Sequence, residues 1–270
     1  MITASAVPAE VFQTGLPRSG QSPGSCCPPP VGAAERISQL VMNFQFMHRV
    51  RKRGEYLFRA GDEFHAFYVL NAGYVKTSYV SEDGCEQTIG LQLRGDILGL
   101  DALATGVYGC DAVTLDACDI LAIPFDALIA SSQKNPALVR EIYQVFSAEI
   151  RADRDLMHTI RRLTAMGRVA AFLLDMSARF ASRGFSGTHL QLRLTRREIG
   201  SMLGLELETV SRAISHLAQS GLIAVNHRDI LLLDRDALDA FIKDAGGQKS
   251  DRERRSGVAV STAFVSPAAG

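Results

Sequence analysis

The spacing of apolar and polar residues divides the chain into a strand-rich part followed by a helix-rich part. From residue 50 to residue 128, Gly73, Gly84 and Gly95 recur about every 11 residues, the spacing of short strands joined by turns. Two strand-like runs flank Asp83-Gly84. That pair indicates a hairpin with a type I′ turn, because such a turn needs a positive φ at both central residues. We therefore predict that this stretch is all-β.

Between Pro136 and Arg162 the apolar residues take a helical spacing that no further Gly or Pro interrupts. Asn135 precedes Pro136, an order typical of a helix start, with Asn as the N-cap and Pro in the first turn. Read as heptads, one stripe holds Val139, Ile142, Phe146, Glu149, Asp153, Leu156 and Ile160. Five apolar residues and two acids fit either a helix packed on its own chain or a two-fold pair of helices.

For the two-fold pair, the helix–helix interface is assigned to Val139, Ile142, Phe146, Ile150, Asp153, Leu156, Met157 and Ile160. Asp153 would then face or nearly face its symmetry mate. Like charges at that position would weaken association of the two helices.

The next segment has the order of a winged helix-turn-helix. A helix over about 164–182 carries Val169, Phe172, Leu173, Met176 and Phe180 at helical spacing. Thr195 and Glu198 form the Thr-x-x-Glu pattern of a capping box, which marks another helix start. Gly204 offers a left-handed residue for a sharp turn. A helix over Leu207–Gln219 and two short strands, LIAV and ILLL, follow.

The helix Leu207–Gln219 separates aliphatic residues from polar ones. Val210, Ile214 and Leu217 share one face, and the opposite face carries Glu208, Ser211, Arg212 and Ser215. Arg can pair with guanine, Glu can accept a hydrogen bond from cytosine, and Ser can bond to several bases. The alternative is a solvated face with a Glu208–Arg212 ion pair. The capping box, the turn and the two strands favour DNA recognition.

We assign base reading to Glu208, Ser211 and Arg212. Contacts to the DNA backbone are assigned to Thr195, Arg196, Arg197, Thr209 and Ser215. The net charge of the whole chain is zero, which argues against a coat-like binder of nucleic acid. The charge is nevertheless uneven. Between residues 161 and 197, Asp175 is the only acidic residue. The same stretch contains eight arginines that could neutralise phosphates: Arg161, Arg162, Arg168, Arg179, Arg183, Arg193, Arg196 and Arg197.

Composition bounds the rest of the chain. With 270 residues, about two domains are expected. Six of the nine prolines lie in the first 30 residues, so we expect a disordered N-terminus. No export signal or run of apolar residues long enough to span a membrane is evident, so we expect a cytoplasmic protein with reduced cysteines. The predicted segments are a disordered N-terminus 1–32, a β-domain 33–130, a dimerisation helix 131–162, a winged helix-turn-helix 163–240 and a disordered tail 241–270.

The β-region, the long helix and the segment LTRREIGSMLGLELETVSRAISHLAQSGLI together resemble the CRP/FNR superfamily of bacterial transcription regulators. LRGDILGLDAL and SARFASRGFS are similar to its FNR branch. The resemblance implies an α+β fold with a cyclic-nucleotide-binding-like β-roll sensor, a dimerisation helix and a winged helix-turn-helix. It also implies a homodimer that reads a palindrome of TTGAT-like half-sites, and most often activates transcription. RNA polymerase would be contacted by the β-roll loop Ser81, Glu82, Asp83 and Gly84.

The sequence departs from the cluster-binding members of the family. Those members hold a [4Fe–4S] cluster with three N-terminal cysteines in Cys-x2-Cys-x5-Cys spacing and a fourth in the β-roll. Here the N-terminus offers only Cys26-Cys27, and Leu121 occupies the position of the fourth ligand. Cys118 lies three residues away, so on a strand it should point to the opposite face. We therefore predict no cluster, and no other metal site.

Two other family ligands are also not expected. Nucleotide-binding members carry Gly-Glu and then Arg-Ser in the phosphate cassette, whereas this chain has Asp101 near the Glu position and no arginine from 95 to 139. A cyclic phosphate such as that of cyclic AMP would lack its charged clamp. His48 and His65 are the histidines in or before the β-roll, and we expect surface positions for both rather than haem ligation.

Two other function classes compete with a DNA-binding regulator. One is a β-roll ligand-binding protein whose winged helix mediates protein contacts. The other is an enzyme, against which the lack of paired catalytic carboxylates, a nucleophile–base arrangement or a phosphate-binding Gly loop argues. The sensed signal and the direction of regulation stay open, as does any redox role of Cys26, Cys27, Cys85, Cys110 and Cys118.

Overall fold

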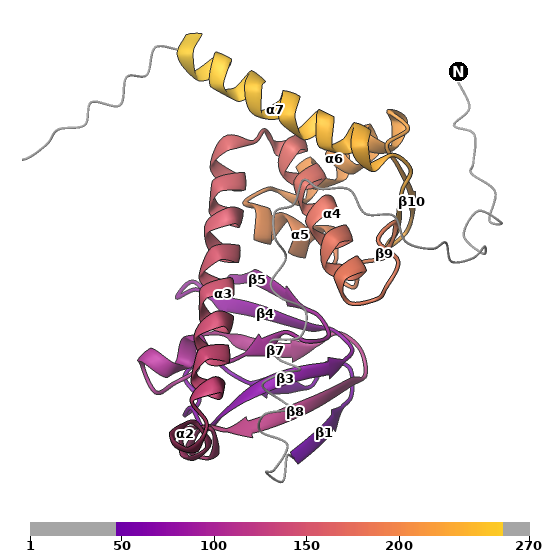
Figure 1. The fold of residues 1–270 in the computed structure, drawn as a ribbon. Helices are drawn as coiled ribbons and strands as arrows, with labels where there is room; N and C mark the ends of the chain where they lie inside the picture. Colours follow the sequence, from indigo (N-terminus) through magenta and orange to yellow (C-terminus); the bar gives the residue numbers. More distant parts are fainter. Residues whose placement is uncertain (1–46, 256–270) are drawn as a thin grey trace, which may run out of the picture.

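A computed structural model (Figure 1) describes the backbone of residues 47–255 and the side chains of residues 48–245. The N-terminal segment 1–32, with Cys26 and Cys27, lies outside the described residues. The described part confirms the expected α+β organisation: a β-domain, a long helix, then a helical domain with a small sheet. No helix in this part of the chain is both long and apolar enough to cross a bilayer.

The β-domain, here called the β-roll domain, is built from two antiparallel sheets that pack face to face (Figure 1). Its strands are β1 (Met47–Arg51), β2 (Tyr56–Phe58), β3 (Ala66–Ala72), β4 (Val75–Val80), β5 (Glu86–Gln92), β6 (Ile97–Leu98), β7 (Asp111–Thr114) and β8 (Cys118–Pro124). One sheet has the order β1-β8-β3-β6 and the other β2-β7-β4-β5. Buried side chains such as Leu70 and Ile120 of the first sheet meet Val75 and Ala112 of the second.

The hairpin predicted around Asp83-Gly84 is present, but its predicted turn type is wrong. Gly84 has a φ of 80°, whereas Asp83 is not among the residues with positive φ. The Gly84 N–H donates to the carbonyl of Ser81, and the Ser81 N–H donates to the carbonyl of Cys85. This is a three-residue loop with glycine as its left-handed residue, a connection that needs only one positive φ.

Two helices follow the sheets, where the sequence predicted one. Helix α2 (Phe125–Lys134) begins directly after Pro124 and buries Leu128. The predicted segment boundary at residue 131 falls within α2. The predicted helix start, with Asn135 as the N-cap and Pro136 in the first turn, is confirmed, since α3 runs over Pro136–Arg162. The boundary falls there because the Asn135 side chain accepts a hydrogen bond from the Ala137 N–H at 3.1 Å, an N-cap that separates the two helices.

The helical domain, here called the winged-helix domain, has the predicted core. Its elements are α4 (Ala165–Ser182), β9 (His189–Gln191), α5 (Arg196–Leu203), α6 (Leu207–Gln219), β10 (Ile223–Asn226), β11 (Asp229–Leu232) and α7 (Arg235–Arg255). The expected apolar faces of α4 and α6 are buried together. The strands form a sheet of order β10-β11-β9, so β9 adds a third strand to the expected pair.

The prediction of a disordered tail from residue 241 is wrong as far as Arg255, because α7 continues to that residue. Leu238, Phe241, Ile242 and Ala245 repeat at helical spacing. Leu238 and Ala245 are buried, and Phe241 and Ile242 pack against the core of the winged-helix domain. Burial of this apolar stripe stabilises the helix, although the segment as a whole is polar.

Candidate nucleic-acid interface

The first helix of the helix-turn-helix is fixed at its start by the predicted capping box. The Thr195 Oγ accepts a hydrogen bond from the Glu198 N–H at 3.2 Å, and the Glu198 carboxylate accepts one from the Thr195 N–H at 2.6 Å. These bonds satisfy two of the backbone donors that a helix start leaves free. Arg196 and Arg197 follow in the first turn and remain at least partly exposed.

Two glycines, one within α5 and one at its end, allow the tight turn between α5 and α6. Gly204 has a φ of 62° and a ψ of 45°, the left-handed geometry that ends α5. Gly200 allows a close approach, because a Cβ at that position would lie 2.4 Å from the backbone oxygen of Leu205. The sequence indicated the role of Gly204 but not that of Gly200. Together these residues fix the angle at which α6 leaves α5.

Helix α6 has the bounds and the two faces that the sequence predicted. Val210, Ile214 and Leu217 are buried against the core. Glu208 and Arg212 lie on the opposite face with side chains 76% and 78% exposed, and the Arg212 guanidinium lies 2.9 Å from the Glu208 carboxylate. Ser211 lies on the same face and is partly exposed. The three residues assigned to base reading thus share one accessible surface.

The residues assigned to the DNA backbone flank that surface. Thr195, Arg196 and Arg197 lie at the start of α5, and Thr209 and Ser215 lie on α6 next to the base-reading residues. All five are exposed or partly exposed. The start of α5 also carries the positive end of a helix dipole, which favours a phosphate nearby.

Several of the eight arginines between residues 161 and 197 are bound within the protein and are therefore less available to DNA. Four of the eight arginines are held within the protein. Arg168 donates to the carbonyl of Leu203, and Arg193 lies 2.9 Å from Asp116. Arg179 and Arg183 both pair with Asp96, and both side chains are largely buried. These four arginines connect parts of the fold, so their charge is less available to phosphates than the sequence alone indicated.

Asp96 lies between β5 and β6, so its pairs with Arg179 and Arg183 join the β-roll domain to α4. Arg179 also donates to the carbonyl of Leu91 at 2.7 Å, and Arg183 donates to the carbonyl of Arg94 at 2.7 Å. Helix α4 is thereby held against the end of β5.

The residues assigned to the helix–helix interface divide into two groups on α3. Ile142 packs toward the β-roll domain and Leu156 toward the winged-helix domain. Ile150 and Met157 are 50% and 53% exposed, and Tyr143, which the sequence analysis did not include, is 69% exposed. Tyr143, Ile150 and Met157 are seven residues apart, so they form one apolar row along the outer face of α3. The signal for Tyr143 was its heptad spacing from Ile150.

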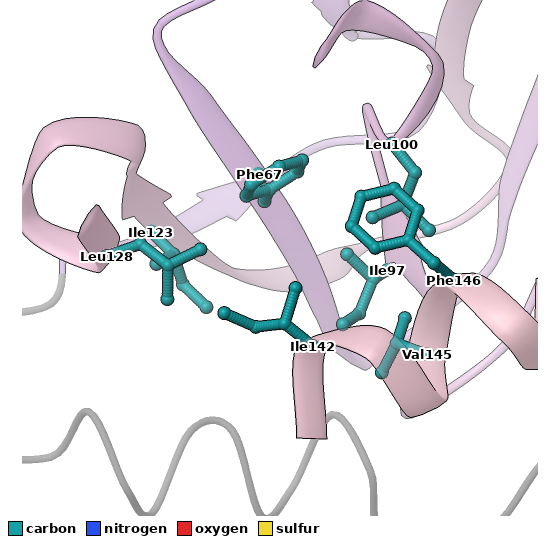
Figure 2. Close-up of a pocket in the computed structure, with 8 residues that line it drawn as sticks. All are labelled: Phe67, Ile97, Leu100, Ile123, Leu128, Ile142, Val145 and Phe146. Carbon is teal, nitrogen blue, oxygen red and sulfur yellow. The ribbon is translucent and has the colours of Figure 1, made fainter. Parts of the chain in front are cut away.

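The inner face of α3 borders a small apolar hollow, shown in Figure 2. It lies between the sheet that contains β3 and β8, helix α2 and helix α3. Its lining residues are Phe67, Ile97, Leu100, Ile123, Leu128, Ile142, Val145 and Phe146. No polar side chain lines it, so it offers no group that could orient a charged ligand.

Comparisons with known proteins agree with this geometry. Residues 167–241 match the Crp-like helix-turn-helix domain, and residues 48–135 match the cyclic nucleotide-binding domain. The transcriptional activator protein anr of Pseudomonas aeruginosa is 38% identical over 200 residues, which cover 74% of this chain and 81% of that protein. The chain belongs to the CRP/FNR family of transcription regulators. It is therefore a DNA-binding regulator and not an enzyme.

Two further comparisons support the CRP/FNR assignment. The fumarate and nitrate reduction regulatory protein of Escherichia coli K12 is 37% identical over 187 residues, covering 69% of this chain and 75% of that protein. The solved structure of FixK2 from Bradyrhizobium japonicum is similar with a TM-score of 0.66 and 28% identity, and covers 73% of this chain and 97% of that one.

In this CRP/FNR member, the β-roll is closely packed around Gly99 and Asp101, the stretch that resembles the phosphate cassette of nucleotide-binding members. The Tyr108 ring fills the space beside Gly99, where an added Cβ would lie 2.9 Å from it, and it stacks on Phe58 with ring centres 3.9 Å apart. Asp101 accepts a hydrogen bond from the Gly109 N–H at 2.9 Å. An anionic carboxylate in the cassette would repel a cyclic phosphate, and no arginine between 95 and 139 offsets it.

The described cysteines do not form a cluster site. Cys85 is exposed, whereas Cys110 and Cys118 are buried. Cys118 packs inside the β-roll while Leu121 packs on the other side of its sheet, so the opposite faces expected for these two residues are confirmed. Burial, reinforced by Asp101 and Asp111, raises the pKa of the Cys110 thiol to about 12, so this thiol is protonated near neutral pH. Within the described residues, no group of three or more potential ligands could hold a metal.

The histidines of the β-roll are at its surface. The Nδ1 of His48 lies 3.3 Å from the Asp119 carboxylate, with 64% of the His48 side chain exposed. The Nε2 of His65 lies 3.7 Å from the Glu63 carboxylate, and this side chain is also exposed.

Proposed function

We propose that this regulator binds as a homodimer to a palindrome of TTGAT-like half-sites, with α6 of each subunit in a major groove. The observation that carries the proposal is the single exposed surface that Glu208, Ser211 and Arg212 share on α6 of a Crp-like helix-turn-helix. Arg212 would pair with a guanine, Glu208 would accept from a cytosine amino group, and Ser211 would complete the contact.

Thr195, Arg196, Arg197, Thr209 and Ser215 would hold the DNA backbone on both sides of α6. Arg196 and Arg197 supply positive charge at the start of α5, which is also the positive end of its helix dipole. The other arginines near α6 matter less in this proposal, since Arg179 and Arg183 are committed to Asp96.

The homodimer would form along α3. The exposed row of Tyr143, Ile150 and Met157 is the apolar surface on which the proposal rests, since apolar residues at heptad spacing favour helix pairing. Asp153 is exposed beside this row and would weaken the pair. The predicted interface residues that pack on their own chain, such as Ile142, would support the helix from behind.

Activation would use the turn between β4 and β5. Ser81, Glu82, Asp83 and Gly84 form an exposed or partly exposed loop at the end of the hairpin, accessible to RNA polymerase. The name of the Pseudomonas aeruginosa relative, a transcriptional activator protein, favours activation over repression.

We further propose that the regulator acts without a [4Fe–4S] cluster, a haem or cyclic AMP. The exposed histidines, the buried thiols of Cys110 and Cys118, and the filled interior beside Tyr108 support this proposal. Cys26 and Cys27 lie outside the described residues, so their part in it rests on sequence spacing alone.

The proposed function is tested by anaerobic purification and absorption spectra before and after air, combined with gel shifts on a TTGAT-N4-ATCAA duplex. We expect a colourless protein that shifts the duplex regardless of air. A broad iron–sulfur band that disappears in air together with DNA binding would contradict the cluster-free proposal. A failure to shift any duplex would contradict DNA recognition and favour a winged helix that contacts proteins.

A further inference from the structure

A buried lysine joins the β-roll domain to the helix-turn-helix. Lys76 of β4 is 8% exposed. Its Nζ lies 2.7 Å from the carboxylate of Glu86 on β5 and 3.0 Å from that of Glu198 on α5. A buried ammonium group is costly unless it is paired, and here two carboxylates from two domains pair with it.

The titration of these groups agrees with a charged cluster. Burial alone would lower the pKa of Lys76, but the hydrogen bonds with Glu86 and Glu198 outweigh it and the pKa is raised. The hydrogen bond from Lys76 lowers the pKa of Glu86 despite burial. Burial would raise the pKa of Glu198, but hydrogen bonds from Thr195 and Lys76 lower it. All three groups therefore stay charged near neutral pH.

The two carboxylate oxygens of Glu198 accept hydrogen bonds from different domains. Its Oε2 accepts from the Thr195 N–H at 2.6 Å and closes the capping box of α5. Its Oε1 accepts from Lys76 at 3.0 Å. The residue that fixes the start of the helix-turn-helix is thus also the residue that the β-roll domain holds.

A second contact lies one turn further along α5. The Thr88 N–H of β5 donates a hydrogen bond to the Ser201 Oγ at 2.8 Å. Glu198 and Ser201 are three residues apart, so they lie on the same face of α5. β5 is the edge strand of its sheet, whose free backbone groups need a partner, and α5 lies along it (Figure 1). We name Lys76, Glu86, Thr88, Glu198 and Ser201 the β5–α5 latch.

The latch connects the β-roll domain to α5, and α5 in turn sets the orientation of α6. Gly200 and Gly204 fix α6 relative to α5, so a movement of α5 on β5 would carry α6 with it. Leu91 and Leu93, at the end of β5, belong to the same apolar core as α4 and α6. In a two-fold dimer, the two recognition helices must lie about 34 Å apart to enter successive major grooves.

We propose that Lys76 is a positioning residue for DNA recognition, and that the β5–α5 latch sets the spacing between the two recognition helices of the dimer. The inference rests on the proposed function, because it needs a dimer that reads a palindrome. Lys76 itself would not touch DNA. Its effect would appear in the preferred distance between half-sites and not in the bases that each half-site contains.

The test uses the full chain with Lys76→Met, which keeps the aliphatic stem and removes the charge. Affinity is measured for a single half-site and for palindromes whose half-sites are separated by three, four or five base pairs. We expect the wild-type protein to prefer one spacing. If the variant leaves about one dimer in ten correctly oriented, affinity for that spacing falls about tenfold, while half-site affinity stays unchanged. Lys134→Met, at an exposed lysine of α2, is the matched control.

A second variant distinguishes loss of the contact with Lys76 from loss of the capping box of α5. Glu198→Gln keeps a residue that a capping box accepts but removes the charge that Lys76 pairs with. We expect it to weaken the preference for one half-site spacing, as Lys76→Met does. The double variant should lose no more affinity at that spacing than either single variant. A wild-type spacing preference in Lys76→Met overturns the inference alone, as does an equal loss of half-site and palindrome affinity. A wild-type protein without any preference for palindromes overturns the proposed function and the positioning role together.

Discussion

Arg212 and Glu208 form an ion pair on α6 with a separation of 2.9 Å, and both side chains are more than three-quarters exposed. An exposed pair at i,i+4 spacing stabilises a helix by only about 0.3–0.5 kcal/mol, because water screens the two charges. The stability of α6 comes instead from the buried residues Val210, Ile214 and Leu217. The pair can therefore open at little cost, which leaves both side chains available to base edges.

The first prediction concerns Arg212→Ala. A bidentate contact between arginine and guanine is worth about 1–3 kcal/mol, so specific binding should weaken by that amount and specificity should relax at one base pair. The measurement is a titration of half-site variants substituted at each position. Gln219→Ala, at an exposed position near the end of α6, is the control and should bind as the wild type does. Unchanged binding at every position would remove Arg212 from the recognition surface.

The second prediction concerns Asp153→Ala. Asp153 is exposed on α3, but neighbouring atoms partly desolvate its carboxyl and raise its pKa, so this charge is already disfavoured within one chain. Near a symmetry mate the repulsion would increase. We expect tighter dimerisation, seen by sedimentation equilibrium as a shift toward dimer at a lower concentration. Arg154→Ala, its exposed neighbour, should produce no such shift. If the variant and the wild type dimerise at the same concentration, Asp153 lies outside the interface.

The third prediction concerns pH and Glu149. Burial of its carboxyl, with Asp96 and Asp153 nearby, raises the pKa of Glu149 from 4.5 to about 7. Between these two values the folded state holds a proton that the unfolded state releases, so the free energy of unfolding should fall as pH rises through this window. The slope should be shallow, because the residue as a whole is exposed and water screens its charge.

Urea unfolding at several pH values across this window measures the slope. Glu149→Gln cannot lose a proton, so its slope should be smaller than that of the wild type. Glu141→Gln, one of the other carboxylates of α3, serves as the comparison. An identical pH dependence in the wild type and Glu149→Gln would show that this carboxyl titrates normally.

Sequence reasoning succeeded where a signal and its structure lie within a few residues. Thr195, Glu198 and Gly204 mark the ends of α5, and the bounds of α6 at Leu207 and Gln219 were predicted correctly. Caps and apolar spacing act over three or four residues, so a single segment contains the whole pattern. The Asp83-Gly84 pair located its hairpin in the same way, but the turn type also depends on how the flanking strands pair.

Contacts between residues distant in the chain could not be predicted from the sequence. Arg179 is 83 residues from Asp96, and Lys76 is 122 residues from Glu198. Nothing in the local pattern distinguishes these side chains from exposed charges, because the fold alone brings the partners together. A local excess of arginine therefore indicated charge available to phosphates, although Arg179 and Arg183 make contacts between the domains.

The fourth prediction concerns Gly200→Ala. The added Cβ would lie 2.4 Å from the backbone oxygen of Leu205, so the turn between α5 and α6 would have to open. Such overpacking typically costs about 1–3 kcal/mol, and here it should also weaken DNA binding by turning α6. Thermal unfolding and gel shifts measure the two effects. Gly221→Ala adds a side chain where no atom lies within 4 Å, so it tests backbone strain without a clash. It should destabilise the protein yet leave α6 in place.

The last prediction tests whether α7 belongs to the folded winged-helix domain. Leu238 is fully buried, and truncating such a leucine to alanine costs about 2–5 kcal/mol through lost burial and the cavity left behind. Leu238→Ala should therefore lower the free energy of unfolding by that amount, measured in urea. Asp239→Ala changes the next residue, whose exposed carboxylate pairs only with Lys243 at 2.6 Å. That change should stay within about 0.5 kcal/mol.

The contrast between these neighbours decides between two descriptions of the C-terminal segment. If α7 contributed nothing to the core, both variants should unfold as the wild type does. If Leu238 anchors α7 against α4, only Leu238→Ala should be destabilised, and its DNA binding should fall as the temperature approaches the lowered unfolding transition. Helix α4 also carries Arg179 and Arg183, which pair with Asp96 of the β-roll domain. Loosening of α7 would thus reach the contacts that hold the two domains together.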